Sequence, residues 1–409
     1  MSPSAGLAEY LTQILSTLRP LRPLPMALLD AHGQIVAEDV TAPGPVPAFD
    51  VAAIDGYAVR TQDLADAAAD APIRLAVVGD LRAASWQPAR LSPGACYGVG
   101  AGTPLPAEAD AVVPVGWTDA GMAAIQVGRP PVPGQGVRHA GELAGAGTLL
   151  AAAGTRVGAG QVGLFAAAGV GSVLVRPRPR VSVVATGDEL VDAGRVSSPG
   201  RVVDTDSYAL TAAAREAGAH AFRIGVVPDE DEALRGLLED QAHRTDLIVV
   251  TGGTGAGPGD VARRLFSQQG AVEYVTLPLH PSAVLGFGRV GADRVPVACL
   301  PGDPGAALLG FEVLVRPVLR RLAGADQPFR PAVKAMLSDP LSSPRDVREF
   351  RPARVTERRG GGYTVSPLPG GEALLAGYAA ANGLLVLGER VANLPAGSTV
   401  DVLLFDRVN

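Results

Sequence analysis

Cysteine and lysine are the two residue types that this sequence nearly lacks. Only Cys96 and Cys299 occur among its 409 residues, and Lys334 is the single lysine. Two cysteines cannot build a disulfide framework, and free thiols are typical of a reducing compartment. The N-terminus also lacks the basic and apolar segments of a secretion signal. These absences predict a cytoplasmic protein.

Net positive charge is missing as well. The chain carries 35 Lys and Arg against 41 Asp and Glu, a net charge of −6, whereas a nucleic-acid-binding domain is usually basic. Residues 157–175 contain no charge and are long enough for a membrane span. They also contain five glycines, and their pattern predicts a helix over 161–168 followed by a strand over 172–175. We therefore expect neither nucleic-acid binding nor membrane insertion.

Apolar residues are abundant enough for more than one core. Hydrophobic residues make up 47% of the chain and charged residues 19%, and the length predicts roughly two to four domains. Leucines and an isoleucine recur at helical spacing over residues 7–18. Proline and glycine cluster over 43–47 and again over 130–136, which marks boundaries around a β-rich stretch.

From Arg176 onwards short apolar runs alternate with helical patterns. The alternation predicts a doubly wound α/β domain with a parallel sheet. In such sheets ligands bind beyond the carboxyl ends of the strands. The predicted strands cover 181–187, 221–227, 247–250, 272–277 and 295–300.

A glycine-rich loop follows the apolar run 247–250. It reads TGGTGAGPGD and leads into a helical segment that Gly270 ends. Backbone N–H groups of such a loop and of a helix N-terminus can hold an anion. The loop has no Gly-Lys pair, so it is not a P-loop, and Pro258 and Asp260 occupy positions that break the dinucleotide fingerprint. Taken by itself, the loop is better explained as a tight β–α turn than as a binding site.

Polar residues gather at three further predicted strand ends. We therefore predict a real site there, whereas the acidic run 229–232 is interpreted as capping of a helix dipole. The four strand ends carry Gly187-Asp188-Glu189, Asp204-Thr205-Asp206, Thr251-Gly252-Gly253 with Asp260, and Pro301-Gly302-Asp303-Pro304.

Eight segments, taken in order, resemble the MoeA family of molybdopterin molybdenumtransferases, which includes the gephyrin E-domain. Each segment alone is moderately specific evidence for this family, and eight segments in the same order are strong evidence. They are FDVAAIDGYAVR, GTPLPAEADAVV, VRHAGE, RPRVSVVATGDELV, VVDTDSYAL, DLIVVTGGTGAGPGD, ACLPGDPGAALLGFEVLVRPVL and AAANGLLVL.

The resemblance implies an α/β plus β, multi-domain homodimer. Its α/β domain would be of the MogA-like, molybdopterin-binding kind. The expected domains are a discontinuous linker or dimer domain (1–45 and 135–176), a β-rich domain (46–134), the α/β domain (177–325) and a small C-terminal β-barrel (326–409).

The resemblance also implies a reaction: insertion of molybdate into adenylylated molybdopterin, with release of AMP and help from Mg²⁺. Asp55, Glu189, Asp204 and Asp260 match family carboxylates and are the expected catalytic residues, the last three also as metal ligands. The expected cofactor-binding residues are Gly187, Asp188, Thr251, Gly252, Gly253, Pro301, Gly302, Pro304, Arg138 and His280.

The chain departs from the family on the basic side of this site. The family's lysine-rich run corresponds to residues 276–283, which contain no lysine and leave His280 as the one basic group there. Two hypotheses follow. The first is the transferase, which the surviving carboxylates favour. The second is a gephyrin-like scaffold that binds a peptide of a protein partner, such as a membrane receptor or a division protein.

Overall fold

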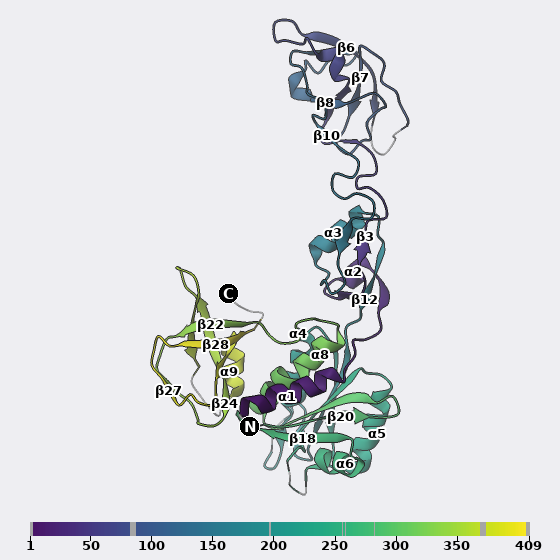
Figure 1. The fold of residues 1–409 in the computed structure, drawn as a ribbon. Helices are drawn as coiled ribbons and strands as arrows, with labels where there is room; N and C mark the ends of the chain where they lie inside the picture. Colours follow the sequence, from purple (N-terminus) through teal and green to yellow (C-terminus); the bar gives the residue numbers. More distant parts are fainter. Residues whose placement is uncertain are drawn as a thin grey trace. The chain divides into compact units, whose positions relative to one another are not determined.

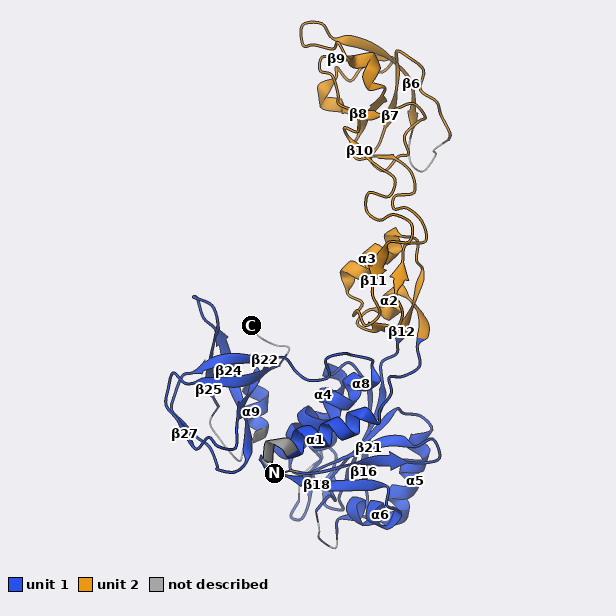
Figure 2. Ribbon diagram, in the orientation of Figure 1, with its two compact units in different colours: residues 1–23, 176–409 blue, residues 24–175 orange. Residues whose placement is uncertain are grey.

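The computed structural model divides the chain into two compact units, residues 24–175 and residues 1–23 with 176–409 (Figure 2). Each unit is described by itself. The structure describes residues 3–81, 87–195, 198–255, 257, 259–281, 283–368 and 374–405.

The larger unit contains a six-stranded sheet with the order β16-β13-β17-β21-β20-β18 (Figure 1). The first four strands in this order pair in parallel, and β20 and β18 form an antiparallel edge. The predicted doubly wound domain is therefore confirmed, although the sequence did not predict β20. The strands are β13 (Arg180–Thr186), β16 (His220–Val227), β17 (Leu247–Thr251), β18 (Val272–Leu277), β20 (Ala283–Val290) and β21 (Val295–Leu300).

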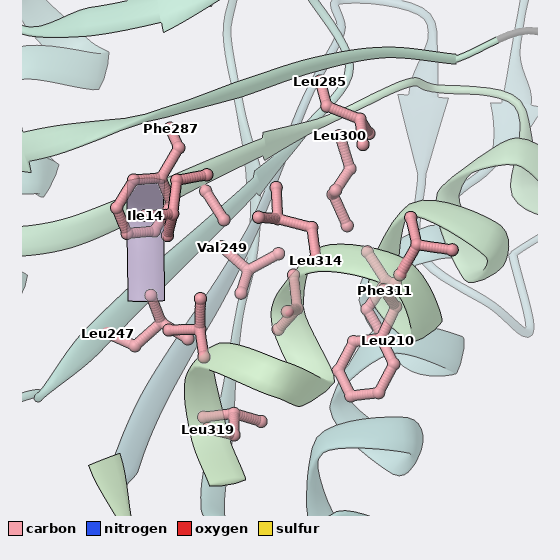
Figure 3. Packing of buried hydrophobic residues seen from close by; sticks show 14 of the residues in the cluster. Ile14, Leu210, Leu247, Val249, Leu285, Phe287, Leu300, Phe311, Leu314 and Leu319 are labelled. Carbon is pink, nitrogen blue, oxygen red and sulfur yellow. The ribbon is translucent and has the colours of Figure 1, made fainter. Parts of the chain in front are cut away.

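Strand β17 is buried on both faces, as its unbroken apolar run predicts. Leu247 and Val249 join one hydrophobic cluster, and Ile248 and Val250 join the other. The first cluster is shared with helices α4 (Asp206–Glu216), α7 (Pro304–Gly310) and α8 (Arg316–Leu322), and Figure 3 shows Leu210, Phe311 and Leu314 within it. The second cluster is shared with α5 (Asp231–Ala242) and α6 (Val261–Gln269).

The N-terminal helix α1 (Pro3–Ser16) belongs to this α/β domain. The prediction placed residues 1–45 together in the linker domain, whereas the structure assigns residues 1–23 to the larger unit. The reason is its apolar face. Leu11 and Ile14 are buried in the same cluster as Val249 of the central strand. A helical pattern shows that a face will be buried but does not show against which core.

The helical segment that begins at Pro304 and ends at Leu322 is interrupted. Between α7 and α8 lies a π-helical turn over Phe311–Val315, which ends two residues before Pro317. Proline has no N–H to offer to the preceding turn, and a π-turn is one way in which a helix accommodates such a defect.

The C-terminal region is a closed five-stranded β-barrel with the order β24-β25-β22-β28-β26. Pairing of β24 with β26 closes it, and this confirms the predicted small barrel. Its strands are β22 (Ala332–Leu337), β24 (Arg348–Glu357), β25 (Tyr363–Pro367), β26 (Gly383–Leu387) and β28 (Thr399–Leu404), with helix α9 (Leu374–Ala380) before β26.

The smaller unit holds two separate hydrophobic clusters of note. One lies in a five-stranded sheet with the order β8-β5-β7-β6-β9, formed by β5 (Gly56–Val59), β6 (Ile73–Leu81), β7 (Ala95–Val99), β8 (Ala111–Pro114) and β9 (Ala124–Val127). The other packs helix α3 (Ala159–Ala167) against β12 (Ser172–Arg176), as predicted for the uncharged segment. Within the described residues, no helix is long and apolar enough to cross a membrane.

Replacing Phe311 by alanine tests the packing on this face of the sheet. The Phe311 side chain is fully buried in the first cluster, so its loss should leave a cavity and lower the free energy of unfolding by about 3–5 kcal/mol. Phe329→Ala is the matched control, because Phe329 is 52% exposed and should change stability by less than about 1 kcal/mol. Denaturant titration of the α/β domain measures both. Equal effects of the two substitutions would contradict this packing.

Candidate functional site

A cavity of about 530 Å³ opens at the carboxyl ends of β13, β17 and β21. The chain reverses direction across the sheet here, because β13 is followed by β16 on one side and then by β17 on the other. Such a switch point leaves a crevice between neighbouring strand ends. The cavity is lined by ten of the predicted site residues, namely Gly187, Glu189, Asp204, Thr251, Gly252, Gly253, Asp260, Pro301, Gly302 and Pro304.

Glycine is required where β17 ends. Gly252 has a φ of +85°, and a Cβ at this position would lie 2.6 Å from the carbonyl oxygen of Thr186. The Cα of Gly252 also lies 3.2 Å from the position that a Cβ of Gly302 would occupy. The ends of three parallel strands can therefore meet only because side chains are missing here.

Asp260 holds the glycine loop in shape. Its Oδ1 accepts a hydrogen bond of 2.9 Å from the N–H of Gly255, and its Oδ2 accepts one of 2.6 Å from the N–H of Gly257. Ala256 and Pro258, the latter predicted to open helix α6, lie outside the described residues. Asp260 thus acts first on the backbone of its own loop, at the rim of the cavity.

Asp204 is fully engaged with protein partners. Its side chain is buried, Oδ1 accepts from the N–H of Ser207 at 3.0 Å, and Oδ2 accepts from the Ser207 hydroxyl and from Arg223 Nη2 at 2.9 Å. A buried carboxylate needs such compensation for its charge. Asp204 therefore fixes the N-terminus of α4 to β16, and its oxygens are not directed at a ligand.

Asp206 lines the same cavity. The sequence placed it at one of the four polar strand ends but assigned it no catalytic or binding role. Its Oδ2 lies 2.7 Å from the Thr251 hydroxyl, which also lies 2.8 Å from the carbonyl oxygen of Pro301. Its Oδ1 is buried and has no hydrogen-bond partner in the described part of the chain, and the same holds for the Thr186 hydroxyl. Burial raises the pKa of Asp206 to about 7, and the charges of Asp204 and Asp303 act in the same direction.

The acidic character of the cavity extends to Asp229. Asp229 and Asp188 hydrogen-bond to each other's backbone N–H groups, at 3.1 and 3.4 Å. Burial raises the pKa of Asp229, and the nearby charges of Asp188 and Glu189 raise it further. The sequence interpretation assigned Asp229 to helix capping. Its position two residues after the end of β16 was the signal for a site residue.

Every charged residue that lines the cavity in the described chain is acidic: Glu189, Asp204, Asp206, Asp229 and Asp260. The N-termini of α4 and α6, whose first residues follow Thr205 and Asp260, also lie at this cavity and contribute the positive ends of their helix dipoles. No group of three or more His, Cys, Asp or Glu residues is arranged to hold a metal ion in the part of the chain that the structure describes. The predicted set of Asp204, Asp260 and Glu189 does not form such a group here.

Four predicted residues do not line this cavity. Asp188 Oδ1 accepts a hydrogen bond from the N–H of Asp229. His280 lies in β19 (Leu279–His280), which pairs with β24 of the barrel. Asp55 and Arg138 belong to the smaller unit, where Asp55 Oδ1 accepts from the N–H of Ala101 at 2.8 Å. There Asp55 lines a separate cavity of about 500 Å³.

The fold and the cavity define a class of protein. Residues 182–321 match the family model described as a probable molybdopterin binding domain. Residues 5–169 match the MoeA N-terminal region (domain I and II), and residues 334–405 match the MoeA C-terminal region (domain IV). The chain belongs to the MoeA family of molybdenum cofactor biosynthesis, which confirms the resemblance seen in the sequence.

Curated relatives match this chain over most of its length. The chain is 39% identical to molybdopterin molybdenumtransferase 1 of Mycobacterium tuberculosis over 93% of this chain and 94% of that protein. It is 29% identical to the molybdopterin molybdenumtransferase of Bacillus subtilis over 94% and 90% of the two chains. Two solved structures of the molybdopterin biosynthesis MoeA protein from Pyrococcus horikoshii superpose with TM-scores of 0.80 and 0.76, at 30% and 25% identity, over 98% of this chain and 99% of each.

Replacing Gly252 by alanine tests the close approach of the strand ends. Alanine at a φ of +85° is strained, and its Cβ would collide with the Thr186 carbonyl oxygen. We expect the free energy of unfolding to fall by more than about 1 kcal/mol. In Gly259→Ala, where a Cβ has nothing within 4 Å, we expect little change. Denaturant midpoints of the two variants decide the matter, and an unchanged Gly252→Ala protein would contradict the described geometry.

The raised pKa of Asp206 predicts a pH-dependent stability. The unfolded chain releases this proton near pH 4, whereas the folded protein keeps it until about 7. Because the unfolded state binds fewer protons between these values, the contribution of Asp206 to stability is lost as the pH rises through this window. Asp206→Asn cannot ionise, so its Tm relative to the wild type should increase from about pH 5 to about pH 8.

Asp326→Asn serves as the control for this measurement, because Asp326 is exposed and does not line the cavity. Its Tm relative to the wild type should stay constant over the same pH range. A constant difference for Asp206→Asn as well would contradict the raised pKa.

Proposed function

We propose that this chain is a molybdopterin molybdenumtransferase, which inserts molybdate into adenylylated molybdopterin and releases AMP. Two kinds of support agree. The relatives described above have this name, and their match to this chain covers nearly their whole length. The family model for molybdopterin binding covers residues 182–321, which contain the whole cavity lining.

The cavity at the switch point is the observation that carries this proposal. Its volume of about 530 Å³ is in the range of cavities that enclose small-molecule ligands, roughly 300–1,000 Å³. It combines apolar walls, such as Val203 and Val284, with acceptor groups and a glycine loop. A planar heterocycle joined to a phosphate requires this combination of surfaces.

The loop and the helix N-termini serve the anionic part of the substrate in this proposal. Asp260 orients the loop over Gly255 and Gly257, so that backbone N–H groups and the dipoles of α4 and α6 supply the positive potential. Glu189 and Asp229 face the cavity as acceptors and would orient the water that attacks the adenylate. Phosphate and molybdate would thus be held without a lysine.

Mg²⁺ is the cofactor that the resemblance implies, and the described residues do not supply its predicted ligand set. Both oxygens of Asp204 are taken by Ser207 and Arg223, and both oxygens of Asp260 accept from loop N–H groups. Mg²⁺ is therefore not part of the proposed mechanism. The homodimer and ligand contacts of Asp55, Arg138 and His280 likewise remain predictions from the resemblance, and the cytoplasmic location remains a prediction from the composition.

The scaffold hypothesis receives no comparable support. The lost lysines suggested it, yet the curated relatives described above are named as transferases. A protein partner peptide is therefore not part of the proposed function.

Complementation of a strain that lacks its molybdenumtransferase tests the proposal. The wild-type chain should restore molybdoenzyme activity. Asp260→Asn should restore at least about tenfold less molybdoenzyme activity. The amide NH₂ group that replaces one carboxylate oxygen is a donor, and it would face the N–H of Gly255 or Gly257, which is also a donor. Asp293→Asn, a matched change at an exposed aspartate, should behave like the wild type.

Failure of the well-expressed wild-type chain to rescue would overturn the transferase proposal. Full rescue by Asp260→Asn would overturn the role assigned to the loop. Measuring the amount of folded protein for each variant by its Tm separates loss of function from loss of the fold.

A further inference from the structure

The floor of the cavity contains an acceptor that the family comparison does not assign. Asp206 is 6% exposed, and its Oδ1 is a buried atom for which the described residues offer no hydrogen-bond donor. A buried polar atom without a partner is destabilising unless a ligand or a water completes it. We propose that Asp206 Oδ1 recognises the exocyclic amino group of a heterocyclic ring bound in this cavity.

Thr251 fixes which oxygen of Asp206 faces the ligand. The Thr251 hydroxyl has one proton and lies within hydrogen-bond distance of both Asp206 Oδ2 and the Pro301 carbonyl oxygen. If the hydroxyl donates to Asp206, Oδ1 is a carboxylate oxygen. If it donates to Pro301, Oδ2 carries the proton and donates to Thr251, and Oδ1 is the carbonyl oxygen. With Asp206 ionised in the first arrangement, Oδ1 is an acceptor in both.

An acceptor at this depth selects the part of the ligand that reaches it. The oxygens of phosphate and molybdate are themselves acceptors and would face Oδ1 without a proton between them. The apolar part of the cavity lining includes Val203, Val284 and Pro304, which suit the faces of a planar ring. An amino group on a heterocycle meets both requirements, since it donates N–H groups from the edge of an apolar ring.

This inference rests on the proposed function, in which the ligand has two such rings. Both the pterin and the adenine of adenylylated molybdopterin carry an exocyclic amino group. The chemistry is shared, and two pairs of probes distinguish the source. Pterin and lumazine differ only by exchange of that amino group for an oxo group, and AMP and IMP differ in the same way.

The experiment measures Kd for the four probes with the full wild-type chain and with Asp206→Leu. The wild type should bind one amino compound at least about tenfold more tightly than its oxo counterpart, because the oxo group would place two acceptors face to face. Asp206→Leu should bind both members of that pair equally. Inorganic phosphate and molybdate should bind equally to both proteins.

Two further variants keep the test independent of folding. Asp206→Ala repeats the comparison with a smaller side chain if Asp206→Leu does not fold. Asp206→Asn should retain the preference, because its amide N–H can donate to Thr251 while its oxygen faces the cavity. A purely structural role of Asp206 would not produce this rescue of ligand preference.

The outcomes are distinct. Discrimination between pterin and lumazine that disappears in Asp206→Leu identifies the pterin, and the same result with AMP and IMP identifies the adenine. Binding by the wild type without discrimination in either pair overturns this inference and leaves the proposed function standing, and discrimination that persists in Asp206→Leu does the same. If the wild type binds none of the four probes, the proposed function fails and this inference fails with it.

Discussion

The parallel pairing of β13 with β17 is the constraint on which the rest of this structure depends. Val181 to Ala185 align with Leu247 to Thr251, and both strands run through the middle of the sheet with helices on either face. Since these strands are buried on both faces, their register is strongly specified by packing. That register brings Thr186 and Gly252 into contact and places the glycine loop beside the acidic turn that follows β13.

Burying several carboxylates at these strand ends is unfavourable, and the protein compensates for their charges in different ways. The charge of Asp204 is matched by Arg223. The charge of Asp260 is shared between two backbone N–H groups. Asp206 responds by holding its proton more tightly, with a pKa of about 7. Desolvation therefore produces three kinds of carboxyl group within one cavity, and each kind suits a different task.

Sequence patterns anticipated most of the elements but fewer of the roles. Apolar runs predicted β13, β17 and β21 because buried parallel strands have a distinctive composition. The antiparallel strand β20 was missed because its residues AVLGFGRV include two glycines and Arg289, which weakens the strand signal. The motif around Asp204 predicted a site residue. Within the described chain, the residue of this motif with an unpartnered acceptor is Asp206. Asp204 has none, because Arg223, which lies 19 positions after Asp204 in the sequence, pairs with it.

The sequence by itself determined the family, the doubly wound class of the α/β domain and the four loops that carry its polar groups. These follow from local composition and from the order of motifs, which are properties of the linear chain. Only the tertiary structure decided that helix α1 packs on the α/β core, that Asp204 is neutralised and that Asp206 Oδ1 is left without a partner. The reason is physical: the partners of a charge and the burial of an atom depend on residues that folding brings together from distant parts of the chain.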